Sequence, residues 1–86
     1  MRTYKIFFDT QKNRVYRNWE YGTEARNKRE AREKAEAEWY LRHDSHMFHL
    51  TVEWAKNAEE IEQYKEMVGL DKFHCINWKP VTWGRR

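Results

Sequence analysis

The chain has few of the residues on which several common site types depend. Cysteine, serine and proline each occur once in 86 residues, and glycine occurs three times. The lone cysteine, Cys75, excludes an intrachain disulfide and a zinc site built from several thiolates. Its strand-like surroundings favour a small buried side chain rather than a nucleophile. The glycines are isolated from one another, which excludes a glycine-rich phosphate loop.

The sequence also lacks a long apolar run. No segment approaches the roughly 20 consecutive apolar residues of a membrane helix, and residues 1–5 lead straight into a predicted strand, without the apolar core of a signal peptide. We therefore expect a cytoplasmic protein with no membrane partner. Hydrophobic residues make up 40% and charged residues 36% of the chain, which is typical of one folded domain over residues 1–86.

Aromatic residues, in contrast, are abundant. They make up 16% of the chain and include five tryptophans and five tyrosines. So many large rings do not all fit in a core of this size, and some must lie at the surface. Exposed tryptophan, tyrosine and arginine side chains are the residue types that most often anchor protein interfaces.

Charge is sorted along the chain. Residues 1–32 carry nine Lys and Arg against four Asp and Glu, residues 33–66 carry four against nine, and residues 67–86 carry four against one. The first boundary falls inside one predicted helix, whose start is basic and whose later part is acidic. The helix dipole disfavours this order by about 0.3–1 kcal/mol per exposed charge. We interpret the basic start as an anion-facing surface, with an ordinary solvated helix of mixed charge as the alternative.

Alternation of apolar and polar residues predicts four strands, and turn-forming residues over 9–13 join the first two as a hairpin. The predicted strands cover about residues 3–9, 14–21, 46–54 and 73–79. The third has a fully apolar inner face after its first residue. The last stops at Pro80, because proline cannot donate to a strand pairing. Residues 80–86 then form a tail that either stays loose or pairs at an edge.

Two helices are predicted between these strands. Each begins with an asparagine followed three residues later by a glutamate, the pattern of a capping box, at Asn27 and Asn57. The first covers about residues 28–43, with Ala31, Ala35 and Trp39 on its inner face. The second covers about residues 58–68, where Gly69 fits a left-handed C-cap. The order β-β-α-β-α-β predicts an α+β domain, with a mostly antiparallel four-stranded sheet and both helices packed on one face.

Histidines cluster over residues 43–49, but their spacing argues against a metal site or a catalytic site. His46 and His49 point to opposite faces of the predicted strand, and His43 ends the preceding helix, which argues against convergence on a metal ion. The only serine, Ser45, is merely adjacent in sequence to an aspartate and a histidine, whereas a catalytic triad requires convergence in space. We expect no catalytic residue, metal or cofactor, and keep a metal-dependent hydrolase only as a testable alternative.

Basic residues interleaved with aromatic residues are the remaining binding signal. One expected patch lies on the second strand and the start of the first helix and comprises Arg14, Tyr16, Arg17, Arg26, Lys28, Arg29 and Arg32. Another lies near the C-terminus and comprises Trp78, Lys79, Trp83, Arg85 and Arg86. Such residues bind phosphates and stack on unpaired bases, and they also suit an acidic protein surface. The alternative role of the C-terminal tryptophans is packing over the open end of the sheet.

Two resemblances bear on function. Residues 18–25 and 29–39 resemble the strand-to-helix step of the arm-type DNA-binding domains of phage integrases. Those domains bind DNA with a three-stranded sheet, of which this sequence offers two strands at that point. In size, charge and aromatic content, the whole chain resembles small phage or prophage accessory proteins, a group that includes CRISPR inhibitors. The second resemblance implies a binding role in the cytosol of a host.

We therefore expect a non-enzymatic binding protein of phage or mobile-element type. Its expected mode of action is to occlude a nucleic-acid-handling host protein, such as a defence nuclease. The alternative is a small basic regulator that binds DNA or RNA with the same residues. Homodimerisation through an unpaired strand edge stays open.

Overall fold

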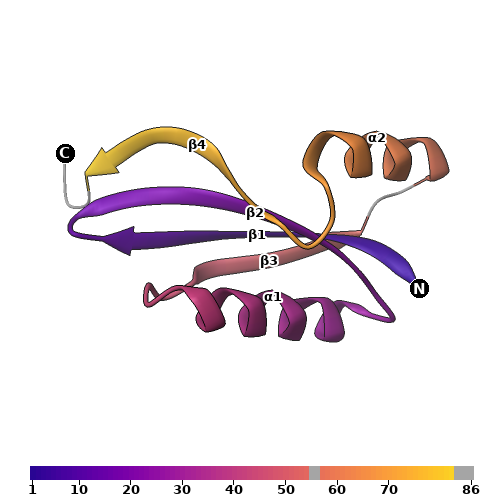
Figure 1. Ribbon diagram of the computed structural model, residues 1–86, viewed down its shortest axis with the longest axis horizontal. Helices are drawn as coiled ribbons and strands as arrows, with labels where there is room; N and C mark the ends of the chain where they lie inside the picture. The colour runs from indigo at the N-terminus through magenta and orange to yellow at the C-terminus, as the bar shows by residue number, and fades with distance from the viewer. Residues whose placement is uncertain (55–56, 83–86) are drawn as a thin grey trace.

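The computed structural model describes the backbone of residues 1–54 and 57–82 and the side chains of residues 1–54 and 57–76. Four strands and two helices follow the predicted order (Figure 1). They are β1 (Arg2–Lys12), β2 (Val15–Ala25), α1 (Lys28–Arg42), β3 (Phe48–Trp54), α2 (Ala58–Val68) and β4 (Phe73–Thr82). The strands form one sheet in the order β3-β1-β2-β4, with all three pairings antiparallel. The predicted α+β class and antiparallel sheet are confirmed.

A long hairpin forms the centre of the sheet. β1 and β2 pair over their whole lengths of eleven residues each. The turn between them consists of Asn13 and Arg14, whose φ angles of 53° and 64° fit a two-residue hairpin turn with both residues left-handed. The turn predicted over residues 9–13 was therefore too long. Residues 9–12 are polar, but they continue the pairing with β2.

α1 covers one face of the sheet. Its inner side consists of Ala31, Ala35 and Trp39, none of which is more than 1% exposed. The alanines let the helix approach the sheet closely, and the Trp39 indole packs edge-on against Phe8, with ring centroids 5.0 Å apart. The strand residues buried in the same cluster are Tyr4, Ile6, Phe8, Tyr21 and Ala25. This inner side is the one predicted for the first helix.

α2 lies against the opposite face, which corrects the prediction that both helices pack on one face (Figure 1). Its buried side chain, Tyr64, lies over Gly22 of β2, where an added Cβ atom would come within 2.5 Å of the tyrosine ring. Gly22 is paired with Lys5 of β1, which forms a 2.7 Å ion pair with Glu60 of α2. Lys5 and Gly22 alternate along their strands with residues that face α1, so α2 meets the reverse face.

β3 is apolar on its inner side only in its middle. It begins at Phe48, two residues later than predicted, and His49 has a φ of 52° where the pairing with β1 shifts register. Leu50 and Val52 pack against the core, whereas Phe48 and Trp54, at the two ends, are 42% and 46% exposed. The apolar inner face that was predicted is therefore buried only in part.

β4 is longer than predicted. It continues through Pro80 to Thr82 and pairs there with the start of β2. The prediction that the strand stops at Pro80 is therefore wrong, and residues 80–82 do not belong to a loose tail. Proline is tolerated at this position because β4 is an edge strand with an irregular pairing. The rest of the predicted tail, residues 83–86, lies outside the described residues.

Candidate binding surfaces

The first predicted basic patch is divided between the two ends of the molecule. Arg14 lies in the hairpin turn and Arg17 close to it on β2, whereas residues 26–32 follow the other end of β2. The hairpin turn and the start of α1 accordingly lie at opposite ends in Figure 1. An eleven-residue strand spans about 35 Å, so the two groups do not form one continuous patch.

At the start of α1, three of the four predicted basic residues are paired along the helix. Each lies near the glutamate four residues on, in the pairs Arg26 with Glu30, Arg29 with Glu33 and Arg32 with Glu36, at 2.9, 3.9 and 3.6 Å. Among the described residues, Lys28 forms no ion pair. Exposed pairs of this kind are worth little, so a partner can displace them at low cost.

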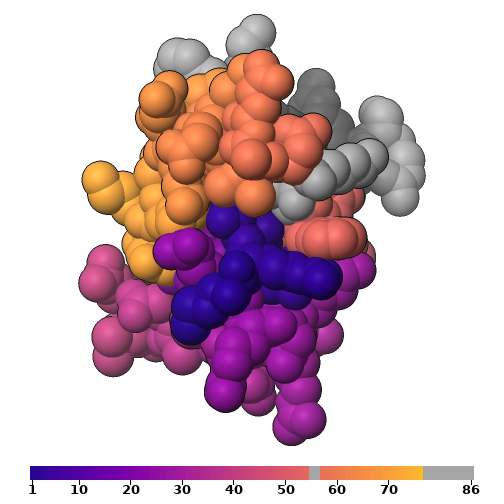
Figure 2. Space-filling model, turned by 90° about the vertical axis from the view of Figure 1, so that its right-hand side faces the viewer, coloured from indigo at the N-terminus to yellow at the C-terminus, as the bar shows by residue number. Residues whose placement is uncertain are grey.

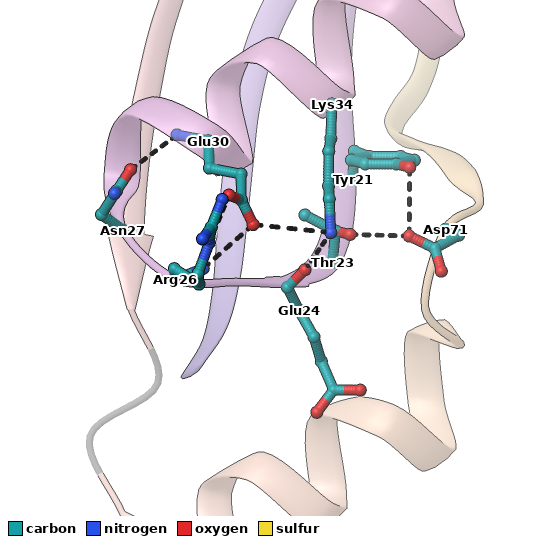
Figure 3. Close-up of polar contacts among 8 residues, drawn as sticks. All are labelled: Tyr21, Thr23, Glu24, Arg26, Asn27, Glu30, Lys34 and Asp71. Carbon is teal, nitrogen blue, oxygen red and sulfur yellow. Dashed lines mark hydrogen bonds and ion pairs between the residues drawn. The ribbon is translucent and has the colours of Figure 1, made fainter. Parts of the chain in front are cut away.

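Polar contacts fix this helix start on the sheet (Figure 3). Asn27 Oδ1 accepts a hydrogen bond from the Glu30 backbone N at 2.8 Å. The Glu30 carboxylate accepts from the backbone N and the Nε of Arg26, at 3.2 and 2.9 Å, and these contacts lower the pKa of Glu30. Lys34 Nζ donates to the Glu24 backbone oxygen at 2.7 Å. Arg26 and Lys34 therefore have structural roles, which leaves Lys28 and Arg29 as the cations that project from the first turn.

Exposed apolar side chains accompany these cations. The register pairs Arg2 of β1 with Ala25 of β2, which brings the start of β1 next to the start of α1. The Arg2 guanidinium lies 4.4 Å from the ring centroid of Trp54, and Met1 is 81% exposed. We call this group the N-terminal surface, defined by Met1, Arg2, Lys28, Arg29 and Trp54. Sequence analysis missed Met1, Arg2 and Trp54, because their approach depends on β3 pairing with β1 rather than with another strand.

The centre of the N-terminal surface has α2 on one side and the start of α1 on the other. Figure 2 shows the start of β1 between these two helical regions. A hollow of about 430 Å³ beside the start of β1 is bordered by Trp54 and by Ile61 and Lys65 of α2. The outer side of α2 exposes Glu59, Glu62 and Glu66, which form no ion pair with any described residue. Opposite charges therefore flank an aromatic centre.

The hairpin end carries a second hollow, of about 440 Å³, on the α1 side of the sheet. Arg17, one of the predicted residues, lines it together with Trp19, Trp39 and Arg42. Arg14 is not among its lining residues and projects from the turn. The combination of arginines with tryptophans is the pattern that sequence analysis sought, but Trp39 and Arg42 come from α1, far along the chain. Their spacing in the sequence therefore does not reveal that these residues lie together.

Tyr16 belongs instead to a polar cluster on the reverse face of the sheet. Asp9 accepts hydrogen bonds from Asn18 Nδ2 at 2.6 Å and pairs with His49 Nδ1 at 3.0 Å. Asn18 Nδ2 also donates to the Tyr16 hydroxyl at 3.3 Å. The hydrogen bond with Asp9, followed by burial, raises the pKa of Tyr16. This cluster fixes the register of the hairpin next to the bulge at His49, and it contains no serine or cysteine that could act as a nucleophile.

The three clustered histidines have separate neighbours. The His43 ring stacks on Trp39, His46 Nδ1 lies 3.2 Å from the Tyr40 hydroxyl, and His49 contacts Asp9. Within residues 1–54 and 57–76, no group of three or more potential metal ligands comes together. The geometry gives the metal-dependent hydrolase alternative no support.

The second predicted patch falls largely outside the described residues. Trp78 lies in β4, where only the backbone is described, and Trp83, Arg85 and Arg86 lie beyond the described chain. Cys75 lies in β4 opposite Trp19 and is half-buried rather than fully buried. Of the predicted partner-binding residues with described side chains, Lys28 and Arg29 belong to the N-terminal surface, Arg14 and Arg17 to the hairpin end, and Tyr16 to its own cluster. Arg26 and Arg32 instead pair with glutamates along α1.

Two further findings complete the description of these surfaces. Neither α1 nor α2 is long and apolar enough to cross a membrane. Comparison with protein-family models, with curated proteins and with solved structures found no match for this chain.

Proposed function

We propose that this chain is a non-enzymatic binding protein that occludes a nucleic-acid-handling host protein, as phage-encoded inhibitors of host defence do. The observation that carries the proposal is the N-terminal surface, where an exposed aromatic centre lies between a basic helix start and an acidic helix. The proposed partner docks on this surface with its nucleic-acid-binding groove.

The centre of the N-terminal surface has the composition of a protein interface. Interface energy concentrates in a few anchors, among which tryptophan and arginine are enriched, surrounded by a polar rim. Arg2 lies over the Trp54 ring at 4.4 Å, and this cation–π contact holds both side chains ready for a partner. Met1 adds flexible apolar surface next to them. These features favour a protein partner over a bare phosphate backbone.

The charges beside this centre favour a partner that handles nucleic acid. Glu59, Glu62 and Glu66 lie three and four residues apart on α2, so they form a row with steps of about 4.5–6 Å along the helix axis. A row of negative charges that form no ion pair with any described residue complements a groove that binds phosphates. On the other side, Lys28 and Arg29 complement the carboxylates with which nucleases hold metal ions. Sorted charge of this kind also orients and accelerates the encounter.

The test measures displacement of nucleic acid rather than capture alone. Proteins captured from host lysate by the immobilised chain are purified, and each is titrated with its labelled DNA or RNA by fluorescence anisotropy, with and without the chain. We expect the chain to displace the nucleic acid. A captured protein that still binds its nucleic acid at a saturating concentration of the chain would contradict occlusion.

Matched variants place the interaction on the N-terminal surface. Trp54→Ala removes the aromatic anchor and should weaken displacement by about tenfold or more, the loss typical of an interface anchor. Phe48→Ala is the control, because it removes an aromatic residue of similar exposure from the other end of the same strand. Equal losses in the two variants would mean that the N-terminal surface is not the docking site.

The nucleic-acid-binding regulator predicts a different result in a simpler experiment. The purified chain alone would bind labelled DNA or RNA at physiological salt, and the double variant Arg29→Glu, Arg32→Glu would lose that binding for all sequences alike. No binding, or binding only at low salt, leaves the occluding inhibitor as the better account.

A further inference from the structure

We propose that the hollow at the hairpin end is a binding site for a nucleotide unit, either a free nucleotide or the terminal nucleotide of a single strand. This site lies at the opposite end of the molecule from the N-terminal surface and goes beyond the proposed function. The proposal rests on the size of the hollow, its rigid aromatic floor and the cations around it. The residues that line the hollow are Thr10, Lys12, Asn13, Val15, Arg17, Trp19, Trp39, Arg42, His43, Asp44 and Ser45.

Size and position fit a small ligand. The hollow measures about 440 Å³, which lies within the usual range of small-molecule sites. It lies between the end of α1 and the turn end of the hairpin, where Lys12 of β1 reaches across to Asp44 at 3.1 Å. Residues from two strands, one helix and one loop therefore enclose it. Such a junction of elements is a common place for ligand sites.

The floor of the hollow is aromatic and rigid. The Trp19 and Trp39 rings meet edge to face, with centroids 5.2 Å apart. Both indole N–H groups are already used, since Trp19 donates to Thr10 Oγ1 at 2.9 Å and Trp39 donates to the Ser45 backbone oxygen at 2.7 Å. The half-buried Trp19 ring therefore offers apolar surface in a fixed position, and the almost fully buried Trp39 ring packs against it. A floor that needs no rearrangement lowers the entropic cost of binding.

His43 supplies the planar surface on which a base can stack. Its ring lies parallel to the Trp39 indole, with centroids 3.7 Å apart and 9° between the planes. Its Nδ1 lies 3.2 Å from the Trp39 backbone oxygen, which further fixes the ring. Trp39 is almost fully buried, whereas His43 is exposed. A base that stacks on the outer side of His43 would extend the existing stack by one ring, as bases do on aromatic platforms.

Cations surround this floor. Lys12, Arg17 and Arg42 line the hollow, against Asp44 as the acidic lining residue. Two of the three form ion pairs with acidic neighbours. Lys12 pairs with Asp44 at 3.1 Å, and Arg42 pairs with Glu38 at 3.7 Å. Arg17 forms no hydrogen bond or ion pair with any described residue. As far as the described residues show, its guanidinium can bind a phosphate, which planar arginine forks hold with two hydrogen bonds.

The test follows the two indole N–H signals of the floor by NMR on the whole ¹⁵N-labelled chain. Adenosine monophosphate, a short single-stranded oligonucleotide and inorganic phosphate are titrated separately at constant ionic strength. We expect saturable shifts of the Trp19 and Trp39 indole signals and of the His43 amide with a ligand that carries a base. Saturation by the mononucleotide identifies a free nucleotide as the source, and saturation by the oligonucleotide alone identifies a strand end. No saturable shift, or equal shifts with inorganic phosphate, would overturn the proposal.

Two charge-removing variants then test the assignment. Arg17→Gln removes one charge-assisted phosphate contact and should weaken binding by about tenfold. Lys72→Gln removes the same charge from an exposed position just before β4 that does not line the hollow, and it should leave the affinity unchanged. Because Arg17 is exposed, unshifted indole signals in the ligand-free variant will show that the floor is intact. Equal affinities in the two variants would overturn the proposal, while failure of the Trp54→Ala test would not bear on it.

Discussion

α1 and α2 begin alike and pack differently. Asn27 and Asn57 each accept a hydrogen bond of 2.8 Å from the backbone N of the glutamate three residues on, as their capping boxes predict. Yet α1 buries three side chains against the sheet, whereas α2 buries Tyr64. Similar local signals therefore produced one core helix and one surface helix.

The sheet beneath each helix explains the difference. The strands present to α1 the large apolar residues of the core, such as Ile6 and Phe8. They present to α2 a strip that contains Lys5, Gly22 and Glu24, which α2 meets with a tyrosine and two ion pairs. A helix on such a strip buries little apolar area and leaves most of its circumference free. The fold thus assigns stability to α1 and a displayed acidic surface to α2.

The largest expected effect tests this assignment directly. Trp39→Ala should reduce the free energy of unfolding by about 3–5 kcal/mol, because removal of the buried indole leaves a cavity in the centre of the aromatic core. Tyr64→Ala should cost less, about 2 kcal/mol, because Tyr64 packs over a glycine outside that core. Urea denaturation measures both values. Equal losses would mean that α2 contributes to the core as much as α1 does.

A second substitution sharpens the comparison at the α2 contact. Gly22→Ala places a Cβ atom 2.5 Å from Cε2 and 2.8 Å from the hydroxyl of Tyr64, so either the Tyr64 ring or α2 must shift. We expect a loss of about 1–3 kcal/mol, typical of overpacking. In the Tyr64→Ala background the same substitution should cost little, because the obstructing ring is gone. An undiminished cost in that background would mean that Gly22 is needed for another reason.

The same contact shows what the sequence could and could not predict. Period-2 and period-3.6 patterns, with two capping boxes, predicted the class and order of the elements and the inner side of α1, since these depend on near neighbours. Nothing at Gly22 or Tyr64 reveals which sheet face receives α2. Trp54 likewise meets Arg2 only because β3 pairs with β1.

The hairpin shows a similar limit in the candidate site. Arg14, Tyr16 and Arg17 were predicted to lie together, and the left-handed turn and strand alternation separate them. Arg17 faces the hollow on the α1 side, while Tyr16 joins Asp9 on the reverse face. Composition predicted that arginines and aromatic rings would meet, and tertiary packing decided which ones.

The two faces of the sheet can also be compared by their response to alkaline pH, because each contains a buried tyrosine. Burial and then the charge of Asp71 raise the pKa of Tyr21 on the α1 side, and burial and then the charge of Glu20 raise the pKa of Tyr64. A tyrosine whose pKa is higher in the folded than in the unfolded chain stabilises the fold fully below about pH 10, and this contribution is lost as pH rises further. One pH unit above that value, we expect each tyrosine to have lowered the free energy of unfolding by about 1 kcal/mol.

Denaturation across this alkaline range checks the expectation. Tyr64→Phe removes the ionisable hydroxyl of the α2 contact, so its stability should fall less steeply with pH than that of the unsubstituted chain. Tyr21→Phe should have a similar effect on the slope, although it also removes the 3.2 Å hydrogen bond to Asp71 and so lowers stability at neutral pH. An unchanged slope in both variants would show that neither hydroxyl is linked to folding.

The smallest expected effect concerns the first turns of the two helices. The first turn of α2 carries Glu59 and Glu60, the charges that the helix dipole favours, whereas α1 begins with basic residues. The double variant Arg29→Glu, Arg32→Glu makes α1 begin more like α2. The gain from the dipole, about 0.3–1 kcal/mol for a charge in the first turn, opposes the loss of two weak pairs worth about 0.2–0.5 kcal/mol each.

Stability of this double variant should therefore change by less than about 1 kcal/mol, measured by thermal and urea denaturation. Its ability to displace nucleic acid from the captured partner should fall, since Arg29 belongs to the N-terminal surface. A large loss of stability would instead show that these arginines hold α1 in place, which would contradict their role in binding. Preserved stability with reduced displacement would show that the unfavourable charge order at the start of α1 serves binding.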